Sequence, residues 1–196
     1  SGKSTTLKAI LERLILSRGG EVTTLTIEDP PEYVIRAAQQ MPVTGVKTQA
    51  DRAEAFTRAI AAGLRSDPDV MMIGEIRDKA SADLAVQGAL SGHPIYASLH
   101  ANTAMDILSR LRDMGIEDFK VFDPTVFSGL VGQRLVRQLC PNCRVPFRDA
   151  VRSERLEPLF ISRVESMLEK TPEEWRDMDN LFVADLRGCS NCSRGY

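Results

Sequence analysis

The first four residues, Ser1-Gly2-Lys3-Ser4, match the second half of the phosphate-loop pattern G-x-x-x-x-G-K-[ST]. In such a loop, backbone N–H groups at a helix N-terminus point at the phosphates of a nucleotide. Lys3 would reach the β- and γ-phosphates, and the Ser4 hydroxyl would bind Mg²⁺. The predicted nucleotide-binding residues are therefore Ser1, Gly2, Lys3, Ser4 and Thr5. The tetrapeptide alone is equally compatible with a solvated tail, so the rest of the chain must decide.

The glycine-rich first half of this pattern, and the strand that normally leads into it, do not precede Ser1. We therefore expect a piece of a longer protein that binds and hydrolyses nucleotide poorly by itself. The residues after the motif favour the helix that a phosphate loop requires. Apolar side chains recur at helical spacing from Thr5 to Ser17, and two glycines follow: Leu7, Ile10, Leu11, Leu14, Ile15, then Gly19-Gly20.

Three short apolar runs, 22–27, 70–73 and 95–99, are typical of strands in a parallel sheet covered on both faces. Helical patterns separate them, at 51–65, 79–91 (beginning near Ser81) and 103–114. Polar clusters follow the runs: Glu28-Asp29, then Gly74-Glu75, then Ser98-Leu99-His100. Ligands of open α/β sheets bind outside the carboxyl ends of the strands, so these clusters and the phosphate loop should share one crevice.

Phosphoryl transfer needs one acid near Mg²⁺ and another that orients or deprotonates the attacking water. Glu75 is the better base, because a buried strand would carry it to the rim of the sheet. Glu28 and Asp29 are the better candidates for the shell around Mg²⁺, and the sequence does not say which of them points inward. His93 and His100 flank one strand, which favours a γ-phosphate sensor or coupling role over a structural or surface one.

Four cysteines form two C-x-x-C pairs, Cys140 with Cys143 and Cys189 with Cys192. Four thiolates suit a closed, tetrahedral and structural Zn²⁺ site better than free thiols or disulfides. We expect an α/β core over 1–139 whose last helix, from about 124 to 139, enters the first pair. Residues 140–196 should form a small zinc-binding subdomain, with helices over about 153–169 and from Thr171-Pro172 onward.

Composition excludes several classes of protein. Apolar residues make up 43% of the 196 residues and charged residues 27%, as in ordinary globular proteins. A formal net charge of -2 provides no basic field for nucleic acid, and no aromatic-plus-basic stripe is present, so no nucleic acid partner is expected. No apolar run approaches the ~18 residues of a membrane-spanning helix.

Together these motifs resemble the secretion ATPase superfamily, the hexameric motors of type II secretion and type IV pili. The matching segments resemble its Walker A, Asp box, Walker B, His box and tetracysteine entry: S-G-K-S-T-T (1–6), T-I-E-D-P-P-E-Y (26–33), L-R-S-D-P-D-V-M-M-I-G-E-I-R-D (64–78), G-H-P-I-Y-A-S-L-H-A-N-T-A (92–104) and G-L-V-G-Q-R-L-V-R-Q-L-C-P-N-C (129–143). They cover most of residues 1–143 in the family's order. The glycine before Glu75, where other Walker B motifs have aspartate, is also a family feature.

The resemblance implies a RecA-like P-loop ATPase core, α/β with a parallel sheet, lacking here its first strand and half of its P-loop. Glu75 would be the catalytic glutamate, Glu28, Asp29 and Glu32 the Asp box acids, and His93 and His100 the His box. Pro31 stands where the family often has a branched apolar residue, which leaves the acids untouched. The resemblance implies ATP, Mg²⁺ and Zn²⁺ as ligands.

The paired cysteines resemble the pilus assembly and type II secretion branch, although the 45 residues between the pairs are many for the family. The resemblance implies a homohexameric cytoplasmic ATPase, held at the inner membrane by a platform protein. The C-terminal stretch resembles one that continues further in the family. Two alternatives stay open: a DNA-transfer or uptake motor of the same superfamily, and a non-catalytic zinc-bearing interaction module.

Overall fold

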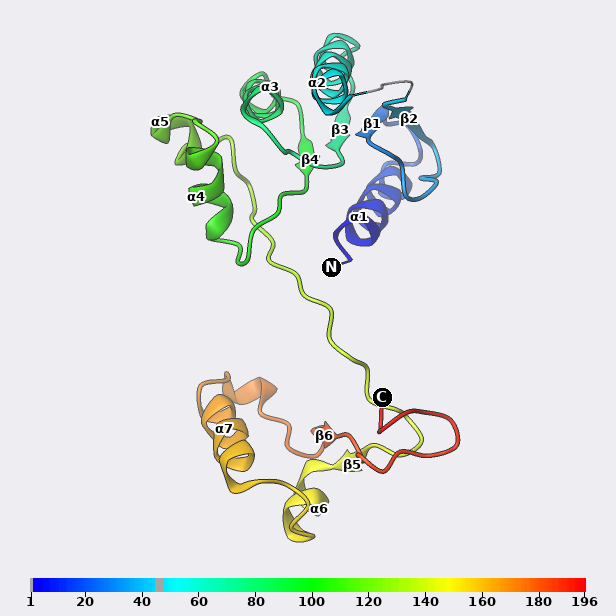
Figure 1. Cartoon of the computed structure of the whole chain (residues 1–196), viewed down its shortest axis with the longest axis vertical. Coiled ribbons are helices and arrows are strands. Elements are labelled where there is room, and N and C mark those ends of the chain that lie inside the picture. Colours follow the sequence, from blue (N-terminus) through cyan, green and yellow to red (C-terminus); the bar gives the residue numbers. More distant parts are fainter. Residues whose placement is uncertain (1, 45–47) are drawn as a thin grey trace. The chain divides into compact units, whose positions relative to one another are not determined.

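The computed structural model describes residues 2–44 and 48–196 (Figure 1). The chain forms two compact units, Ser1–Leu135 and Val136–Tyr196. Each unit is described by itself below. None of the described helices is both long and apolar enough to cross a membrane.

The first unit is built on a four-stranded parallel sheet in the order β2-β1-β3-β4. Its strands are β1 (Thr24–Glu28), β2 (Ala38–Pro42), β3 (Val70–Ile73) and β4 (Ile95–Ala97). The helices are α1 (Lys3–Ser17), α2 (Gln49–Arg65), α3 (Lys79–Leu90), α4 (Asp106–Asp113) and α5 (Asp118–Val121). The α/β class with a parallel sheet is thus confirmed.

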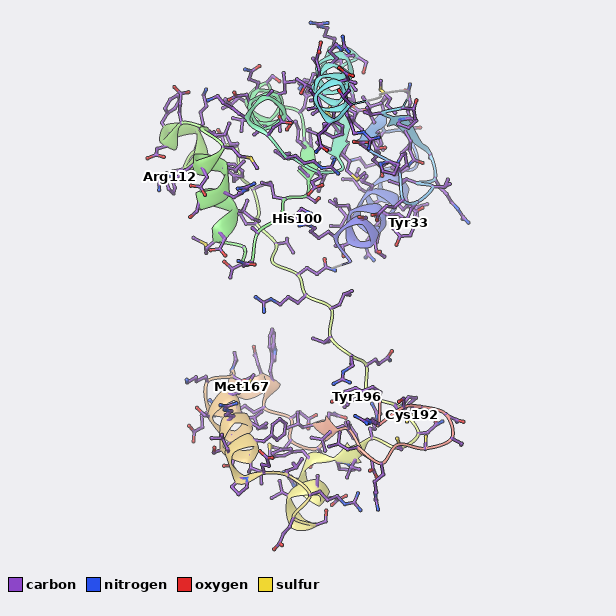
Figure 2. All side chains as sticks on the ribbon, in the orientation of Figure 1. Tyr33, His100, Arg112, Met167, Cys192 and Tyr196 are labelled. Atoms are coloured by element: carbon purple, nitrogen blue, oxygen red, sulfur yellow. The ribbon has the colours of Figure 1, made fainter. Side chains whose placement is uncertain are left out.

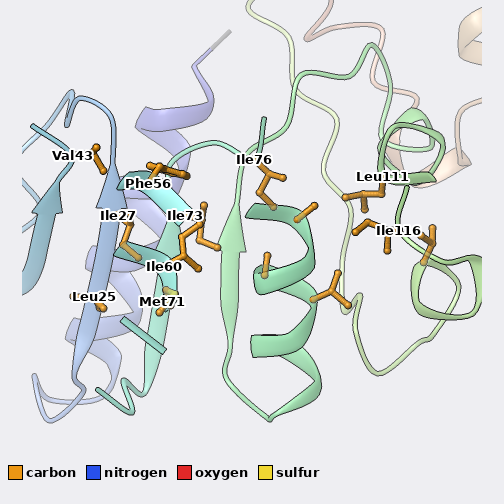
Figure 3. Packing of buried hydrophobic residues seen from close by; sticks show 14 residues of the cluster. Leu25, Ile27, Val43, Phe56, Ile60, Met71, Ile73, Ile76, Leu111 and Ile116 are labelled. Atoms are coloured by element: carbon orange, nitrogen blue, oxygen red, sulfur yellow. The ribbon is translucent and has the colours of Figure 1, made fainter. Parts of the chain in front are cut away.

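Helices cover both faces of this sheet (Figure 1). On one face Leu25 and Ile27 of β1 and Met71 and Ile73 of β3 pack against α2 and α3, in the core drawn in Figure 3. The other face packs on α1 through Leu11. All residues of β1 and β3 are buried. Burial on both faces explains why these strands read as continuous apolar runs rather than as alternating patterns.

Local sequence signals begin two of the helices. The Thr48 hydroxyl accepts a hydrogen bond from the backbone N–H of Asp51 at the start of α2. Asp78 caps α3 by accepting from the backbone N–H of Ser81, whose hydroxyl approaches the Asp78 N–H in return. Such caps satisfy backbone donors that have no partner inside the helix. The capped start of α3 also holds the Glu75–Asp78 turn that follows β3.

The expected helix over 124–139 is wrong, because residues 129–140 have no regular secondary structure. Gly129 and Gly132 disfavour a helix there. The backbone at Gly132 lies close to Ala104, just before α4, because a Cβ at position 132 would lie 3.1 Å from the Ala104 nitrogen. Instead, the segment makes a side-chain hydrogen bond to a residue of α1. Thr6 donates from Oγ1 to Gln133 Oε1 at 2.8 Å, so the segment contacts the start of α1.

The second unit contains a two-stranded antiparallel sheet, β5 (Val145–Pro146) with β6 (Phe182–Val183). Two helices follow β5, α6 (Phe147–Arg152) and α7 (Pro158–Glu169), where one helix over 153–169 was predicted. The helix predicted from Thr171 is only a 3₁₀ turn, Glu173–Trp175. Thr171 does not cap it, because its hydroxyl donates back to the Met167 carbonyl at 2.9 Å. The buried apolar residues at the centre of the second unit include Phe147 and Ala150.

Candidate active site and metal centre

A cavity of about 650 Å³ lies where β1 and β3 end and α1 begins. His100, which follows β4, and Tyr33, which follows β1, are among its lining residues and are labelled in Figure 2. Nine of the predicted site residues line this one cavity: Gly2, Lys3, Ser4, Thr5, Glu28, Asp29, Glu32, Glu75 and His100. Ser1 was predicted with them but lies outside the described residues. The carboxyl edge of the parallel sheet therefore gathers residues from four distant parts of the chain.

The start of α1 forms one side of the cavity. Gly2 precedes the helix in the left-handed region, with φ 75°, and a Cβ there would lie 2.9 Å from Gln133 Nε2. Glycine adopts this left-handed conformation without the strain that a side chain would bring. Lys3 donates from Nζ to the Leu99 carbonyl at 2.9 Å and lies 3.5 Å from His100 Nδ1.

Glu75 is held from two sides at the end of β3. Its Oε1 lies 2.7 Å from His100 Nε2, and its Oε2 accepts a hydrogen bond from Arg77 Nε at 2.7 Å. The Glu75 side chain is 20% exposed, so it is reachable from the cavity. Each carboxylate oxygen of Glu75 thus has one partner, and because each can accept a second hydrogen bond, Glu75 can still receive one from another group.

Asp29 and Glu28 both line the cavity and are both largely buried, but their partners differ. Asp29 lies between two arginines, 3.5 Å from Arg52 Nη1 and 3.5 Å from Arg77 Nη1. Glu28 instead accepts hydrogen bonds from Thr26 at 2.7 Å and from the Gln40 amide at 2.9 Å. The charge of Asp29 is thus balanced by cations, whereas Glu28 is bonded only to neutral donors.

His93 lies away from these groups. The Ser91 hydroxyl is 2.9 Å from its Nδ1, and its Nε2 lies 3.4 Å from the Asp67 carboxylate. The residue does not line the cavity that holds His100. The two histidines flank the same short strand, as predicted from the sequence, but on opposite ends of it, so only His100 contacts Glu75.

Three residues of this site were not singled out from the sequence: Arg52, Arg77 and Gln40. Arg77 follows Glu75 by two residues, and that spacing was available as a signal. Gln40 lies on β2, a strand that the sequence analysis missed altogether. Arg52 lies in the first turns of α2 and reaches Asp29 only through the tertiary fold.

The cavity fits a nucleotide phosphate and a hard cation. Gly2 places no side chain over the backbone N–H groups at the start of α1, and Lys3 supplies a positive charge. Both residues line the same cavity. Mg²⁺ prefers oxygen ligands, which Ser4, Glu28 and Asp29 offer there. These residues could hold a magnesium nucleotide between α1 and the ends of β1 and β3.

The second unit holds a four-thiol cluster formed by Cys140, Cys143, Cys189 and Cys192. All four sulfur atoms lie within 4.8 Å of one another. Three of the pairs are 3.5, 3.7 and 3.9 Å apart. A tetrahedral zinc site with Zn–S bonds of about 2.3 Å has sulfur atoms about 3.8 Å apart. The donor set and its spacing therefore fit Zn²⁺; Cys192 is labelled in Figure 2.

Tight turns shape the second half of this cluster. Gly188 and Gly195 have φ of 73° and 80°. A Cβ at Gly195 would lie 2.7 Å from the Asp185 carbonyl oxygen, and one at Gly188 would lie 2.9 Å from the Arg194 nitrogen. Glycine is therefore required on both sides of the Cys189–Cys192 turn.

The thiols differ in acidity. Desolvation, together with hydrogen bonds from the other thiols, raises the pKa of Cys143 far above its ordinary value. Desolvation also opposes ionisation of Cys192, but hydrogen bonds from the Cys189 and Gly195 backbone and from neighbouring thiols lower the pKa of Cys192 to about 7. Cys192 therefore ionises more readily than Cys143.

The first unit is a parallel α/β unit with a cavity that fits a nucleotide phosphate, and the second unit holds four clustered thiols. These two features together indicate a nucleotide-binding protein with a metal-binding unit. The family model described as "Type II/IV secretion system protein" matches residues 1–196. The chain belongs to this family, which confirms the resemblance to the secretion ATPase superfamily.

Relatives of this chain include proteins named for type II secretion. It is 48% identical to "Type II secretion system protein E" of Dickeya dadantii over 147 residues, 75% of this chain and 28% of the relative. It is 44% identical to "Type II secretion system ATPase E" of Vibrio cholerae over 169 residues, 83% of this chain and 32% of the relative. The chain thus spans about a third of the length of these relatives.

A solved structure of the pilus retraction motor PilT with bound ADP is also similar. It is 35% identical in sequence, with a TM-score of 0.49 over 61% of this chain and 34% of that chain.

Proposed function

We propose that the protein containing this chain is an ATP-hydrolysing motor of a type II secretion or pilus assembly system. The observation that carries the proposal is the convergence of Lys3, Glu75 and His100 on one cavity, linked by contacts of 2.7 and 3.5 Å. A cation for the phosphates and a carboxylate that can orient water are parts that phosphoryl transfer uses, and His100 contacts both of them here.

In the proposed reaction, water attacks the γ-phosphorus of ATP and the bond to the bridging β-oxygen breaks. Lys3 and the backbone N–H groups at the start of α1 would hold the phosphates. Glu75 would orient the attacking water and accept its proton at an unshared lone pair of its carboxylate. Mg²⁺, when bound, would neutralise charge on the β- and γ-phosphates. Ser4 and Glu28 are the residues we assign to its side of the site, with Asp29 fixed by arginines behind them.

His100 lies between the phosphate-binding Lys3 and the base Glu75, so it could report phosphate occupancy to the base. His93 is proposed as the second residue of this sensor, acting from the far end of β4 rather than by contact with Glu75. We further propose Zn²⁺ in the thiol cluster as a structural ion that holds the second unit together, because four thiolates leave no open position for a reacting group.

The wider assignment follows from the relatives. They are named as parts of type II secretion systems, and the Vibrio cholerae relative as an ATPase. By that similarity we propose a homohexamer that works in the cytoplasm against a platform protein of the inner membrane and supplies work for protein transport. The net charge of -2 supports a protein partner over a DNA track.

The test is ATP hydrolysis by the full-length protein with Mg²⁺, compared with its Lys3→Ala variant. We expect steady phosphate release by the unmodified protein and a loss of nucleotide binding in the variant, because Lys3 supplies the cation at the start of α1 that would hold the phosphates. Lys170→Ala, at an exposed position in the second unit, is the control and should behave as the unmodified protein. Equal hydrolysis by Lys3→Ala would contradict the proposal.

A further inference from the structure

Gln40 lies on the edge strand β2 beside the predicted acids. In the parallel pairing of β1 with β2, Gln40 is in register with Thr26. Side chains two residues apart on a strand share a face, so Thr26 and Glu28 point to the same side of the sheet as Gln40. This places an amide, a hydroxyl and a carboxylate together at the carboxyl end of β1.

The Gln40 amide makes three hydrogen bonds. Its Nε2 donates to Glu28 Oε1 at 2.9 Å and to the Tyr33 carbonyl at 2.9 Å. Its Oε1 accepts from the Ile35 backbone N–H at 3.0 Å. Both amide protons and the amide oxygen are therefore used. One side chain thus ties the Glu28 carboxylate to the loop that leads from β1 to β2.

The other oxygen of Glu28 is left available. Thr26 and Gln40 both bond to Oε1. Within the described part of the chain, no hydrogen bond or ion pair engages Oε2, although Glu28 lines the cavity. A carboxylate clamped through one oxygen presents the other in a defined direction, which is how outer partners orient the ligands of a metal.

We propose that Gln40 is a positioning residue that aims Glu28 Oε2 at the magnesium side of the nucleotide. The inference rests on the proposed function and adds a residue to it. Asp29 does not have this arrangement, because Arg52 and Arg77 approach both of its oxygens at 3.5 Å. The geometry therefore separates the two adjacent acids: Glu28 faces the cation and Asp29 organises the arginines.

A purely structural role of Gln40 is the competing account, since the same amide also ties Tyr33 and Ile35. The two accounts differ in whether Gln40 acts through Glu28. If it does, removing Gln40 should cost little once Glu28 can no longer bind a cation. Two residues that act as one unit give non-additive effects, whereas independent residues give additive ones.

The experiment is a double-mutant cycle in the full-length protein with Gln40→Met and Glu28→Gln. Two quantities are measured for each variant: the kcat of ATP hydrolysis, and the factor by which Mg²⁺ tightens binding of a non-hydrolysable ATP analogue, which needs no turnover. We expect Gln40→Met alone to lower both by about 10- to 100-fold. In the Glu28→Gln background, Gln40→Met should lower kcat and the Mg²⁺ factor by less than about 3-fold further. Equal losses in both backgrounds would overturn the proposal.

Thr26→Val provides a variant that does not disturb the loop, because it removes only the second donor to Glu28 Oε1. It should weaken the Mg²⁺ effect on analogue binding, and Thr26→Ser should restore it. Gln39→Met is the matched control: the same change on the same strand, at the exposed neighbouring position, with no effect expected. If Thr26→Val and Gln40→Met both bind the magnesium analogue as the unmodified protein does, Gln40 has no positioning role. Absence of hydrolysis in the unmodified protein would instead reject the proposed function itself.

Discussion

His100 Nε2 lies 2.7 Å from Glu75 Oε1, so a residue after β4 contacts the carboxylate that follows β3. The other ring nitrogen of His100 lies 3.5 Å from Lys3 Nζ. One imidazole therefore joins the phosphate-binding end of α1 to the proposed base. A phosphate group that drew Lys3 toward itself would alter the partners of His100 and, through them, those of Glu75.

This contact predicts that His100→Ala lowers kcat for ATP hydrolysis by about 10²-fold, because a base misplaced by about 1 Å loses that much. Nucleotide binding should change much less, since Lys3 keeps its bond to the Leu99 carbonyl. Met105→Ala, at an exposed position a few residues further on, is the control. A variant with unchanged kcat would remove His100 from the site.

Gly74 predicts a second effect. A Cβ at this position would lie 3.3 Å from the Ile27 carbonyl oxygen and 3.4 Å from Glu28 Cγ. Gly74→Ala should therefore push β1 and Glu28 aside, lowering the free energy of unfolding by about 1–3 kcal/mol and weakening the effect of Mg²⁺ on nucleotide binding. Denaturant unfolding checks the first and titration the second. Gly129→Ala adds a Cβ that meets nothing within 4 Å and should leave both unchanged.

Position 74 is also where other Walker B motifs have aspartate. Glycine at position 74 gives Glu28, from the neighbouring strand, the space that a side chain there would occupy. The sequence analysis noted this glycine only as a family feature. The pairing of β1 with β3 brings Glu28 of the adjacent strand beside it.

Zinc gives a third prediction. Metal analysis of the purified protein should find about one Zn²⁺ per chain, and Cys192→Ser should lose it and unfold residues 136–196. Ser193→Ala is the neighbouring control. Because the pKa of Cys143 is raised, zinc binding must displace a proton that is still held at neutral pH. Zinc affinity should therefore fall as pH is lowered, and a metal-free protein that stays folded would reject the site.

Much of the first unit could be predicted from local pattern. The strands β1 and β3 are unbroken apolar runs, and α3 begins at a recognisable cap, Asp78. The strand β2 was missed because its sequence, A-Q-Q-M-P, lacks β-branched residues and ends in proline, so it becomes a strand only by pairing with β1. The error over 124–139 has a different cause. Helical spacing of apolar residues suggested a helix, but Gly129 and Gly132 disfavour one, and Val131 and Leu135 are exposed.

The sequence predicted which residues form the site, but not which of them contact one another. Sequence spacing placed Lys3, Glu28, Asp29, Glu75 and His100 at one edge of a sheet, and the cavity contains them all. It could not show that His93 lies against Asp67, or that Arg77 bridges Glu75 and Asp29. Those relationships depend on side-chain directions that only the folded chain determines.

The most direct test of the account is a comparison of ATP binding and ATP hydrolysis in the full-length Glu75→Gln variant. The amide keeps the size of the side chain but cannot accept the proton of the attacking water. We predict ATP affinity close to that of the unmodified protein and a kcat lowered by about 10²–10⁴-fold. Hydrolysis at the unmodified rate would contradict the account, because Glu75 could then not be the base.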